Sequence, residues 1–306
     1  MLQTSTRSRI KVYYELTKPR IWYLLVFTAF GAAVTASNVY DVEVSIYTWV
    51  LVIMAVASGS AAANTITNYR DRDIDSVMTR TQSRPIPSKR ITPGSAKKFG
   101  LLLALIAIIL TSLLSYTTTI INGILATFFM CIGLFDNIIV YSYLLKRKSK
   151  LNIILGGFSG AAPSMIGYVA VTTEGLFTLG LIIGGLVFIW IPMHIWALAL
   201  HYKKDYNKVD VPMLTSIISE RAATRVISFT TMMMVSFSIT PFFIQINGQT
   251  AIGLVYLITA IISGIVITTL SLMAIVKPLE KKAWLLFKFS NPYLAILFIA
   301  LMLGSI

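Results

Sequence analysis

Three aspartates within five residues, Asp71, Asp73 and Asp75, stand out in a chain that has only 12 acidic residues among 306. They follow a long apolar stretch directly, so they lie at the end of a predicted membrane-spanning helix. Carboxylates gathered at a membrane surface need a compensating charge, which a metal ion, basic neighbours or both can supply. This cluster is therefore the first place to look for chemistry.

Helical geometry brings two of these carboxylates onto one face. If the preceding helix continues through residue 75, a rotation of about 100° per residue places four oxygen-bearing side chains within an arc of about 60°, namely Asn64, Asn68, Asp71 and Asp75. Asp73 then points to the opposite side. Oxygen ligands of this kind suit Mg²⁺, which proteins hold through one or two carboxylates and substrate phosphates. Spacing alone fits equally well with ion pairs between these acids and neighbouring arginines.

Two further basic residues, Arg80 and Arg84, follow the carboxylates in a loop that Pro85 and Pro87 prevent from becoming helical. Guanidinium groups match phosphate oxygens through paired hydrogen bonds. Acidic residues, a metal and arginines side by side favour a diphosphate-binding site over a solvated ion-pair network.

A second acidic loop, residues 201–214, contains Asp205 and Asp210. A carboxylate facing the first group would complete a cradle for two metal ions and a diphosphate. Between the two acidic loops in the sequence lies a basic run, residues 146–150. Membrane topology alone can explain this run, although Lys146 could also contact phosphate.

The elements that must position these groups are predicted to be transmembrane helices. The chain is 56% hydrophobic and only 12% charged, about half the charged fraction of a soluble domain. The single Cys131 excludes a disulfide framework and a cysteine-based metal site. We predict an all-α polytopic membrane protein in which residues 1–306 form one domain of nine transmembrane helices. The apolar runs lie at 21–38, 46–66, 98–115, 119–142, 152–172, 176–200, 224–244, 250–275 and 285–304.

The distribution of basic residues predicts the topology. All 26 Lys and Arg residues lie in the N-terminal segment or in and beside alternate connections between the predicted spans. The positive-inside rule then puts the N-terminus in the cytosol and the C-terminus outside the cell membrane. The net charge of +14 reflects this topology and an attraction to lipid headgroups, not nucleic-acid binding. Because the long polar connections are the cytosolic ones, we expect the active site on that side.

Motifs along almost the whole chain resemble, in order, the UbiA superfamily of intramembrane prenyltransferases, and within it the heme O synthase (protoheme IX farnesyltransferase) branch. They are Leu16-Thr17-Lys18-Pro19-Arg20, the acidic string 71–75 with Arg80 and Arg84, Tyr141 with Lys146, Gly156-Gly157, His194-Ile195-Trp196 and Asp205-Tyr206. Two positions depart from the pattern. Thr67 stands where the superfamily usually has Asn, so Asn64 or Asn68 would replace that ligand. Met193 and Ile195 flank His194 in place of Pro and Phe.

The resemblance implies transfer of a farnesyl group from farnesyl diphosphate to a vinyl group of heme b, with Mg²⁺ as cofactor. The implied metal ligands are Asn68, Asp71, Asp75 and Asp205. Arg80 and Lys146 would join the aspartates in stabilising the leaving diphosphate. The implied substrate-binding residues are Asn68, Arg84, Lys18, Arg20, His194 and Tyr141. A heme A synthase or another oxidase assembly factor is an implied partner.

An ionisable side chain inside a span, such as His194, is a functional candidate by default. It could bind heme iron or a propionate, although a packed, hydrogen-bonded histidine fits its position equally well. Asp136 in the fourth predicted span is a similar case: it could line a polar substrate cavity, or it could mark a helix end that is shifted toward water.

Two alternative functions share some of these features. A UbiA-type enzyme acting on a quinone precursor or a glycerol phosphate lipid would use the aspartates but would not need Thr17-Lys18-Pro19-Arg20 or His194. A membrane transporter would place its binding groups near the bilayer midplane. Here the acidic residues cluster at the cytosolic ends of helices, which favours the enzyme.

Overall fold

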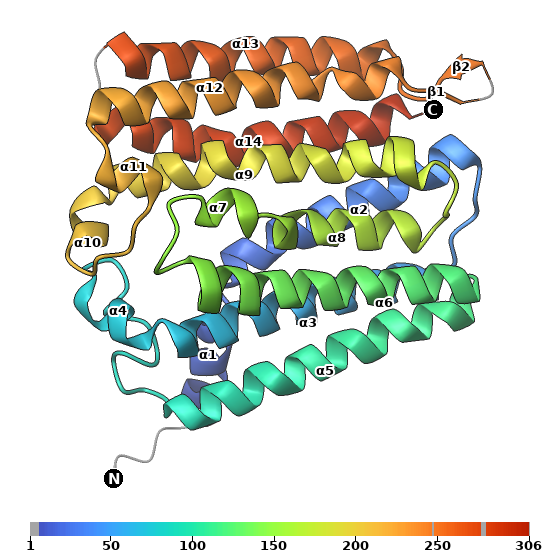
Figure 1. The fold of residues 1–306 in the computed structure, drawn as a ribbon. Coiled ribbons are helices and arrows are strands. Elements are labelled where there is room, and N and C mark those ends of the chain that lie inside the picture. The colour runs from blue at the N-terminus through green and yellow to red at the C-terminus, as the bar shows by residue number, and fades with distance from the viewer. Residues whose placement is uncertain (1–5, 247, 277–279, 306) are drawn as a thin grey trace.

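The structure is a computed structural model that describes residues 6–246, 248–276 and 280–305. Long helices run side by side through the molecule, as Figure 1 shows. They are α2 (Pro19–Tyr40), α3 (Ile46–Arg70), α5 (Pro93–Thr117), α6 (Ile120–Phe135), α9 (Leu181–His201), α12 (Glu220–Ser238), α13 (Leu254–Val276) and α14 (Glu280–Gly304). The predicted all-α membrane fold is confirmed, and a two-stranded hairpin, β1 (Gln245–Ile246) and β2 (Gln249–Thr250), is the only sheet in the described residues.

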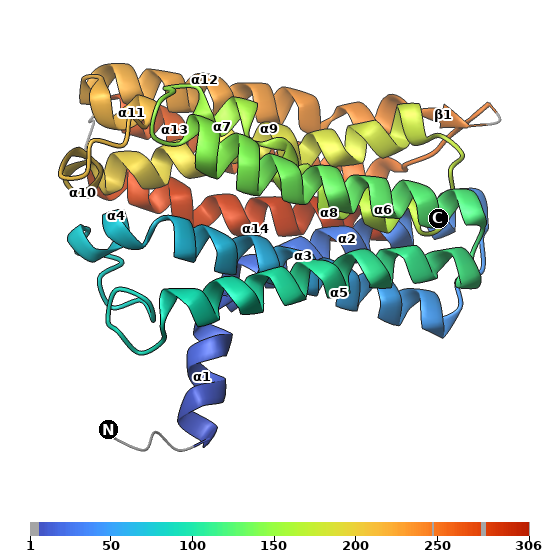
Figure 2. The same ribbon diagram turned by 60° about the horizontal axis from the view of Figure 1, so that its bottom comes forward.

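Shorter elements complete the bundle. They are α1 (Thr6–Leu16), α4 (Arg72–Val77), the π-helix η1 (Asp136–Leu145), α7 (Asn152–Leu155), α8 (Phe158–Val169), the π-helix η2 (Leu176–Gly180), α10 (Lys203–Asn207), α11 (Leu214–Ile217) and the 3₁₀-helix η3 (Thr240–Phe243). The helices α4, α10 and α11 gather at one end of the bundle, opposite the hairpin, in both Figure 1 and Figure 2. We call this the loop end. The helix α1 lies toward this end and projects away from the bundle, at a steep angle to the long helices (Figure 2).

The count of nine spans is not confirmed. Within the described residues, eight helical segments are long and apolar enough to cross a membrane. The fifth predicted span, residues 152–172, is divided into α7 and α8 at Gly156 and Gly157. At 1.5 Å per residue, the 12 residues of α8 cover about 18 Å, less than the roughly 30 Å hydrocarbon core. Every residue from 161 to 170 is buried, because α8 packs between α2, α6 and α9.

The break between α7 and α8 explains why the fourth predicted span contains an acidic residue, Asp136. Asp136 begins η1 and is buried, and its carboxylate accepts the backbone N–H of Ser159 at 2.8 Å. Backbone N–H groups in the first turn of a helix have no partner within the helix, and the helix dipole favours negative charge there. Asp136 is therefore a cap supplied from a neighbouring helix, not a displaced helix end.

Close backbone approach fixes α8 against α2. A Cβ atom on Gly167 would lie only 1.9 Å from the carbonyl oxygen of Ala29, so no larger residue fits there. Small residues at helix crossings allow this kind of packing in membrane proteins. The α2–α8 contact forms part of the wall of the cavity described next.

Candidate active site

The first acidic motif lies where α3 passes into α4 at the loop end. The helix is interrupted at Asp71, whose φ and ψ are −90° and 7°. Helical hydrogen bonds nevertheless continue through the break, from Asp71 N–H to the Thr67 carbonyl at 2.9 Å and from Asp75 N–H to the Asp71 carbonyl at 2.8 Å. The Asp71 and Asp75 side chains therefore stay on one face. Asp73 points away, as helical geometry predicts, and its side chain is 60% exposed.

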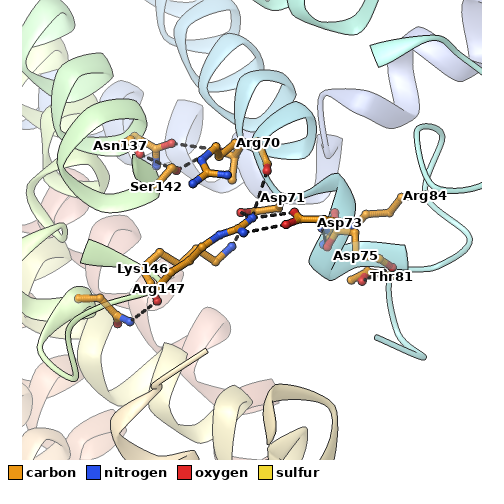
Figure 3. A network of polar contacts seen from close by, with 12 residues as sticks. Arg70, Asp71, Asp73, Asp75, Thr81, Arg84, Asn137, Ser142, Lys146 and Arg147 are labelled. Atoms are coloured by element: carbon orange, nitrogen blue, oxygen red, sulfur yellow. Dashed lines mark hydrogen bonds and ion pairs between the residues drawn. The ribbon is translucent and has the colours of Figure 1, made fainter. Parts of the chain in front are cut away.

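Each of the three carboxylates has a basic partner. Asp71 forms a buried ion pair with Lys146, and Asp73 accepts two hydrogen bonds of 2.7 Å from Arg147 (Figure 3). Asp75 accepts hydrogen bonds of 2.8 and 2.7 Å from one nitrogen of Arg84.

Electrostatics stabilise the charged form of Lys146. Burial alone would lower the pKa of this ammonium group, but the adjacent Asp71 carboxylate outweighs burial and raises the pKa above its usual value. The hydrogen bonds from Arg147 lower the pKa of Asp73 to about 2. Lys146 and Asp73 therefore stay charged at neutral pH.

The second acidic motif reaches this cluster through a backbone contact. Asp205, in α10, accepts the backbone N–H of Arg80 at 3.2 Å and lies 3.5 Å from the ammonium group of Lys208. Although burial opposes it, hydrogen bonding from residues 79 and 80 lowers the pKa of Asp205. The Arg80 guanidinium lies 5.0 Å from the ring centre of Tyr202. Asp205 therefore holds the loop that carries Arg80, and Asp210 lies outside the cluster, exposed and with a φ of 51°.

A cavity of about 320 Å³ opens beside the acidic cluster and extends into the bundle. Its mouth is charged and is lined by Lys18, Asp71, Asp75, Arg80, Arg84 and Lys146. Its interior is mostly apolar and is built from α2, α3, α6, α8 and α9. On α3 the lining runs from Asp71 back to Val56, a length of about 22 Å at 1.5 Å per residue. A charged mouth and a long apolar interior suit an amphiphile with an anionic head and a hydrocarbon tail.

Lys18 has an unusual setting at this mouth. It caps the start of α2 with a φ of 51°, a left-handed conformation that is rare outside glycine. Burial, helped by the positive charges of Arg84 and Lys146, lowers the pKa of Lys18 to about 7, against the opposing effect of Asp75 and Asp71. A bound anion would therefore favour its charged form.

The predicted site residues divide into two groups. Asp71, Asp75, Arg80, Arg84, Lys146, Tyr141 and Lys18 line the cavity. Asp205, Asn68, Arg20 and His194 do not. Asp205 acts on the mouth through Arg80, and Arg20 is exposed at the start of α2.

Asn68 faces a different part of the chain from the one that the arc of helical positions predicted. Its amide nitrogen donates to the Leu16 carbonyl at 2.8 Å, which fixes the segment just before Lys18. Asn64 and Thr67, on the same helix, line the cavity instead. The predicted helix face therefore holds for Asp71 and Asp75, which both line the cavity. Asn68 lies at the edge of that face, where the end of α1 covers it.

His194 lies beside the cavity. It is half-buried on α9, and its Nδ1 lies 2.6 Å from the hydroxyl of Ser290 on α14. Trp190, one turn earlier, lines the cavity and stacks on the imidazole with ring centres 4.2 Å apart. Trp190 thus forms the wall between His194 and the cavity.

Two polar residues of the cavity wall, Asn137 and Ser159, were not predicted from the sequence. Asn137 accepts a hydrogen bond from Thr67 at 3.2 Å and donates to Ser159 at 3.4 Å. Asn137 lies in η1, where the Lys146 N–H bonds to the Tyr141 carbonyl five residues earlier. A π-helix has no periodicity signature in sequence, although such segments are frequent at functional sites.

Comparisons with known proteins identify the family of this chain. The model of the UbiA prenyltransferase family matches residues 24–303. A protoheme IX farnesyltransferase 2 of Cenarchaeum symbiosum is 57% identical over 306 residues, covering 100% of this chain and 99% of that protein. A protoheme IX farnesyltransferase of Thermoplasma volcanium is 40% identical over 296 residues, covering 97% and 98%.

Solved structures share the fold. A digeranylgeranylglyceryl phosphate synthase aligns with a TM-score of 0.73 at 21% identity, covering 97% of this chain and 98% of its own. A UbiA homologue from Archaeoglobus fulgidus bound to DMAPP and Mg²⁺ aligns with a TM-score of 0.59 at 12% identity, covering 93% and 98%. At these identities the structures establish the architecture alone. Together with the family match and the full-length relatives, they establish that this chain belongs to the UbiA prenyltransferase family.

Proposed function

We propose that this protein transfers the farnesyl group of farnesyl diphosphate to a vinyl group of heme b and so produces heme O in the membrane. The observation that carries the proposal is the cavity, whose charged mouth continues into an apolar interior lined by α2, α3, α6, α8 and α9. The names of the full-length relatives, protoheme IX farnesyltransferases at 57% and 40% identity, support heme as the acceptor.

The acidic cluster fits magnesium. Oδ1 of Asp71 is buried and accepts no hydrogen bond from the described residues, although the Asp71 carboxylate is paired through its other oxygen. Asp75 lies on the same face one turn later. We assign Asp71 and Asp75 as the metal ligands on the first motif and Asp205 as the acid of the second. Bound Mg²⁺ supplies Lewis-acid stabilisation of the departing diphosphate.

The basic side chains at the mouth are then positioned for the diphosphate oxygens. Lys146 and Arg84 now neutralise Asp71 and Asp75. With the aspartates engaged by metal, both cations can turn to phosphate without leaving a buried charge unpaired. Arg80 and Lys18 complete the set of basic side chains around the mouth of the cavity. Charge that grows on the leaving group during ionisation is met by groups already in place.

The reaction follows from this arrangement. The allylic C–O bond breaks, and its electron pair leaves with the diphosphate. The farnesyl cation forms against apolar walls and the Tyr141 ring, where exclusion of water slows its capture. The π-electrons of the heme vinyl group attack the farnesyl carbon that lost the diphosphate, and the new bond forms at the terminal carbon of the vinyl group. Water then adds to the new cation beside the macrocycle and loses a proton, leaving a hydroxyethylfarnesyl side chain.

We further propose that the loop end faces the cytosol, with the N-terminus inside and the C-terminus outside. The basic residues near α4, α10 and η1 support this orientation through the positive-inside rule. We assign His194, beside the Trp190 wall, to the heme, and Arg20, exposed at the start of α2, to the propionates of heme or to lipid headgroups. The apolar product is expected to pass through the membrane to a heme A synthase or to an oxidase assembly factor.

A product assay tests the function. The purified protein in lipid receives heme b, Mg²⁺ and farnesyl diphosphate, and mass spectrometry detects the heme products. We expect farnesylated heme. Prenylation of a quinone precursor or a glycerol phosphate lipid, without any heme product, would retain the diphosphate site and reject heme as the acceptor.

A further inference from the structure

Five aromatic rings stack in sequence along α9 and α14 outside the cavity. They are Trp190, His194, Phe287, Trp284 and His201, with successive ring centres 4.2, 4.4, 5.1 and 4.6 Å apart and interplanar angles between 17° and 27°. Trp190, at the inner end, is shared with the cavity wall. His194, the second ring, contacts a buried hydroxyl group, that of Ser290.

Ser290 is held rigidly. It is fully buried, and its carbonyl oxygen accepts the indole N–H of Trp190 at 2.8 Å. Its hydroxyl oxygen lies 2.7 Å from the Phe287 carbonyl oxygen and 2.6 Å from Nδ1 of His194. Two contacts of hydrogen-bonding length therefore meet at one hydroxyl group.

Counting protons decides the direction of both bonds. A serine hydroxyl carries a single proton, and a carbonyl oxygen can only accept. The Phe287 carbonyl and the Ser290 oxygen, 2.7 Å apart, need that proton between them. Nδ1 of His194 must then donate its own proton to Ser290. No carboxylate pairs with His194 among the described residues, so the ring is neutral and its Nε2 carries a free lone pair.

We propose that Ser290 is a positioning residue that fixes His194 as the Nδ1-protonated tautomer, so that Nε2 is the nitrogen that binds the iron of a metalloporphyrin. This inference rests on the proposed function, which it deepens by naming the atom that recognises the acceptor. A histidine that binds a metal through one nitrogen characteristically donates its other N–H to a fixed acceptor, which sets the tautomer.

The ligand class follows from the number of donors. Among the described residues, His194 has no group of other His, Cys, Asp or Glu side chains around it that could complete a metal site. A single imidazole can bind only a metal that brings its remaining ligands with it, as iron does in a porphyrin. The neighbouring rings of Trp190 and Phe287 stack on the imidazole and hold its plane. A macrocycle held there lies next to the wall of the prenyl cavity.

The first test reads the tautomer directly. The chain has only two histidines, so ¹⁵N-histidine labelling of the full-length protein in lipid gives two imidazole signal sets, which a His201→Asn variant assigns. We expect His194 to be protonated at Nδ1 and unprotonated at Nε2, and we expect this preference to be lost in Ser290→Ala. A wild-type His194 protonated at Nε2, or a tautomer unchanged in Ser290→Ala, would overturn the proposal. This measurement needs no substrate, so it is independent of the proposed function.

The second test reads the metal bond. Ferric heme b is titrated into wild type, Ser290→Ala and His194→Asn, and the Soret band is followed. Asparagine keeps a side-chain N–H near the Nδ1 position and lacks a counterpart of Nε2, so it separates loss of the ligand from loss of packing. We expect heme affinity to fall by about 10- to 100-fold in Ser290→Ala and the ligand-dependent Soret shift to vanish in His194→Asn. His201→Asn is the matched control and should retain the shift.

Metal-free protoporphyrin IX separates iron binding from stacking, and the variants should bind it as the wild type does. An equal loss of affinity for both porphyrins would reduce Ser290 and His194 to packing residues and overturn the proposal. Formation of farnesylated heme by the wild type together with a Soret band unaffected by His194→Asn would also overturn it, while leaving the proposed function intact.

Discussion

Lys146 and Asp71 are 75 residues apart in the sequence and form a buried ion pair at the mouth of the cavity. The pair joins the end of α3 to the end of η1. Leaving either buried charge without a partner would cost free energy. We therefore expect Asp71 to gain a metal ion and Lys146 to gain a phosphate group at the same time.

Asp71→Asn tests this exchange. The amide keeps the size of the side chain but removes the charge that a metal needs, so we expect the turnover rate to fall by about a hundredfold to a thousandfold. The measurement is product formation at saturating Mg²⁺ and farnesyl diphosphate. Asp73→Asn is the matched control, because Asp73 lies two residues away but is exposed and faces Arg147. Equal rates in the two variants would remove Asp71 from the metal site.

Proton uptake should accompany diphosphate binding near neutral pH. Burial lowers the pKa of Lys18 to about 7, so at pH 8 most of the free protein has this lysine uncharged. An anion placed beside it raises the pKa and draws in a proton. Calorimetric titration of inorganic diphosphate at fixed Mg²⁺, in two buffers of different ionisation enthalpy, measures the uptake. Lys18→Met should show less uptake than wild type, and an identical buffer dependence would contradict the assignment.

The same pKa has a consequence for stability. The pKa of Lys18 is lower in the folded protein than the usual lysine value, so the unfolded chain binds more protons between about pH 7 and 10. Folding stability therefore rises with pH across that window, and the cost of burying a charged Lys18 is fully present below pH 7. Thermal unfolding of wild type and Lys18→Met should diverge as pH falls through the window.

Gly59 is expected to limit prenyl chain length. It lines the cavity 12 residues before Asp71, about 18 Å deeper along the helix, and a Cβ there would lie 2.5 Å from Sδ of Met130. Gly59→Leu should fill the deep end and favour geranyl over farnesyl diphosphate, whereas Met130→Ala should admit longer chains. Competition between donors of different length measures the preference. Dimethylallyl diphosphate, too short to reach Gly59, is the control, and an unchanged preference would place the tail elsewhere.

Asp136 should matter for stability. Asp136→Ala removes the acceptor of the Ser159 N–H at the first turn of α8, which we expect to destabilise the protein by about 1–2 kcal/mol. Asp136→Asn keeps an accepting oxygen and should be milder. Thermal unfolding in one detergent compares the two. Identical melting temperatures for the alanine variant and the wild type would show that the cap contributes little.

Much of the acidic site could be predicted from sequence because its geometry is local. Asp71 and Asp75 are four residues apart, and helical rotation alone puts them on one face. The pairing of Lys146 with Asp71 could not be predicted from spacing, because it depends on how η1 packs against α3. Spacing also gave no sign that Asn68 turns toward Leu16, since the covering segment comes from another part of the chain.

The span count shows where hydropathy reasoning loses force. Residues 152–172 are apolar enough to suggest a span, but hydropathy does not distinguish a side chain that faces lipid from one that faces protein. Paired glycines at 156 and 157 mark the break that the structure shows. The polar Asp136, read from sequence as either a cavity lining or a displaced helix end, proved to be the partner of that break.

The short buried helix α8 also constrains how the molecule is assembled. A segment of this length cannot satisfy the bilayer by itself, and its first turn depends on a carboxylate from another helix. It can settle only after α2, α6 and α9 surround it. The part of the cavity wall that α8 supplies is thus completed last. A chain whose helices insert into the membrane but do not assemble would therefore lack a binding site for the hydrocarbon tail of the substrate.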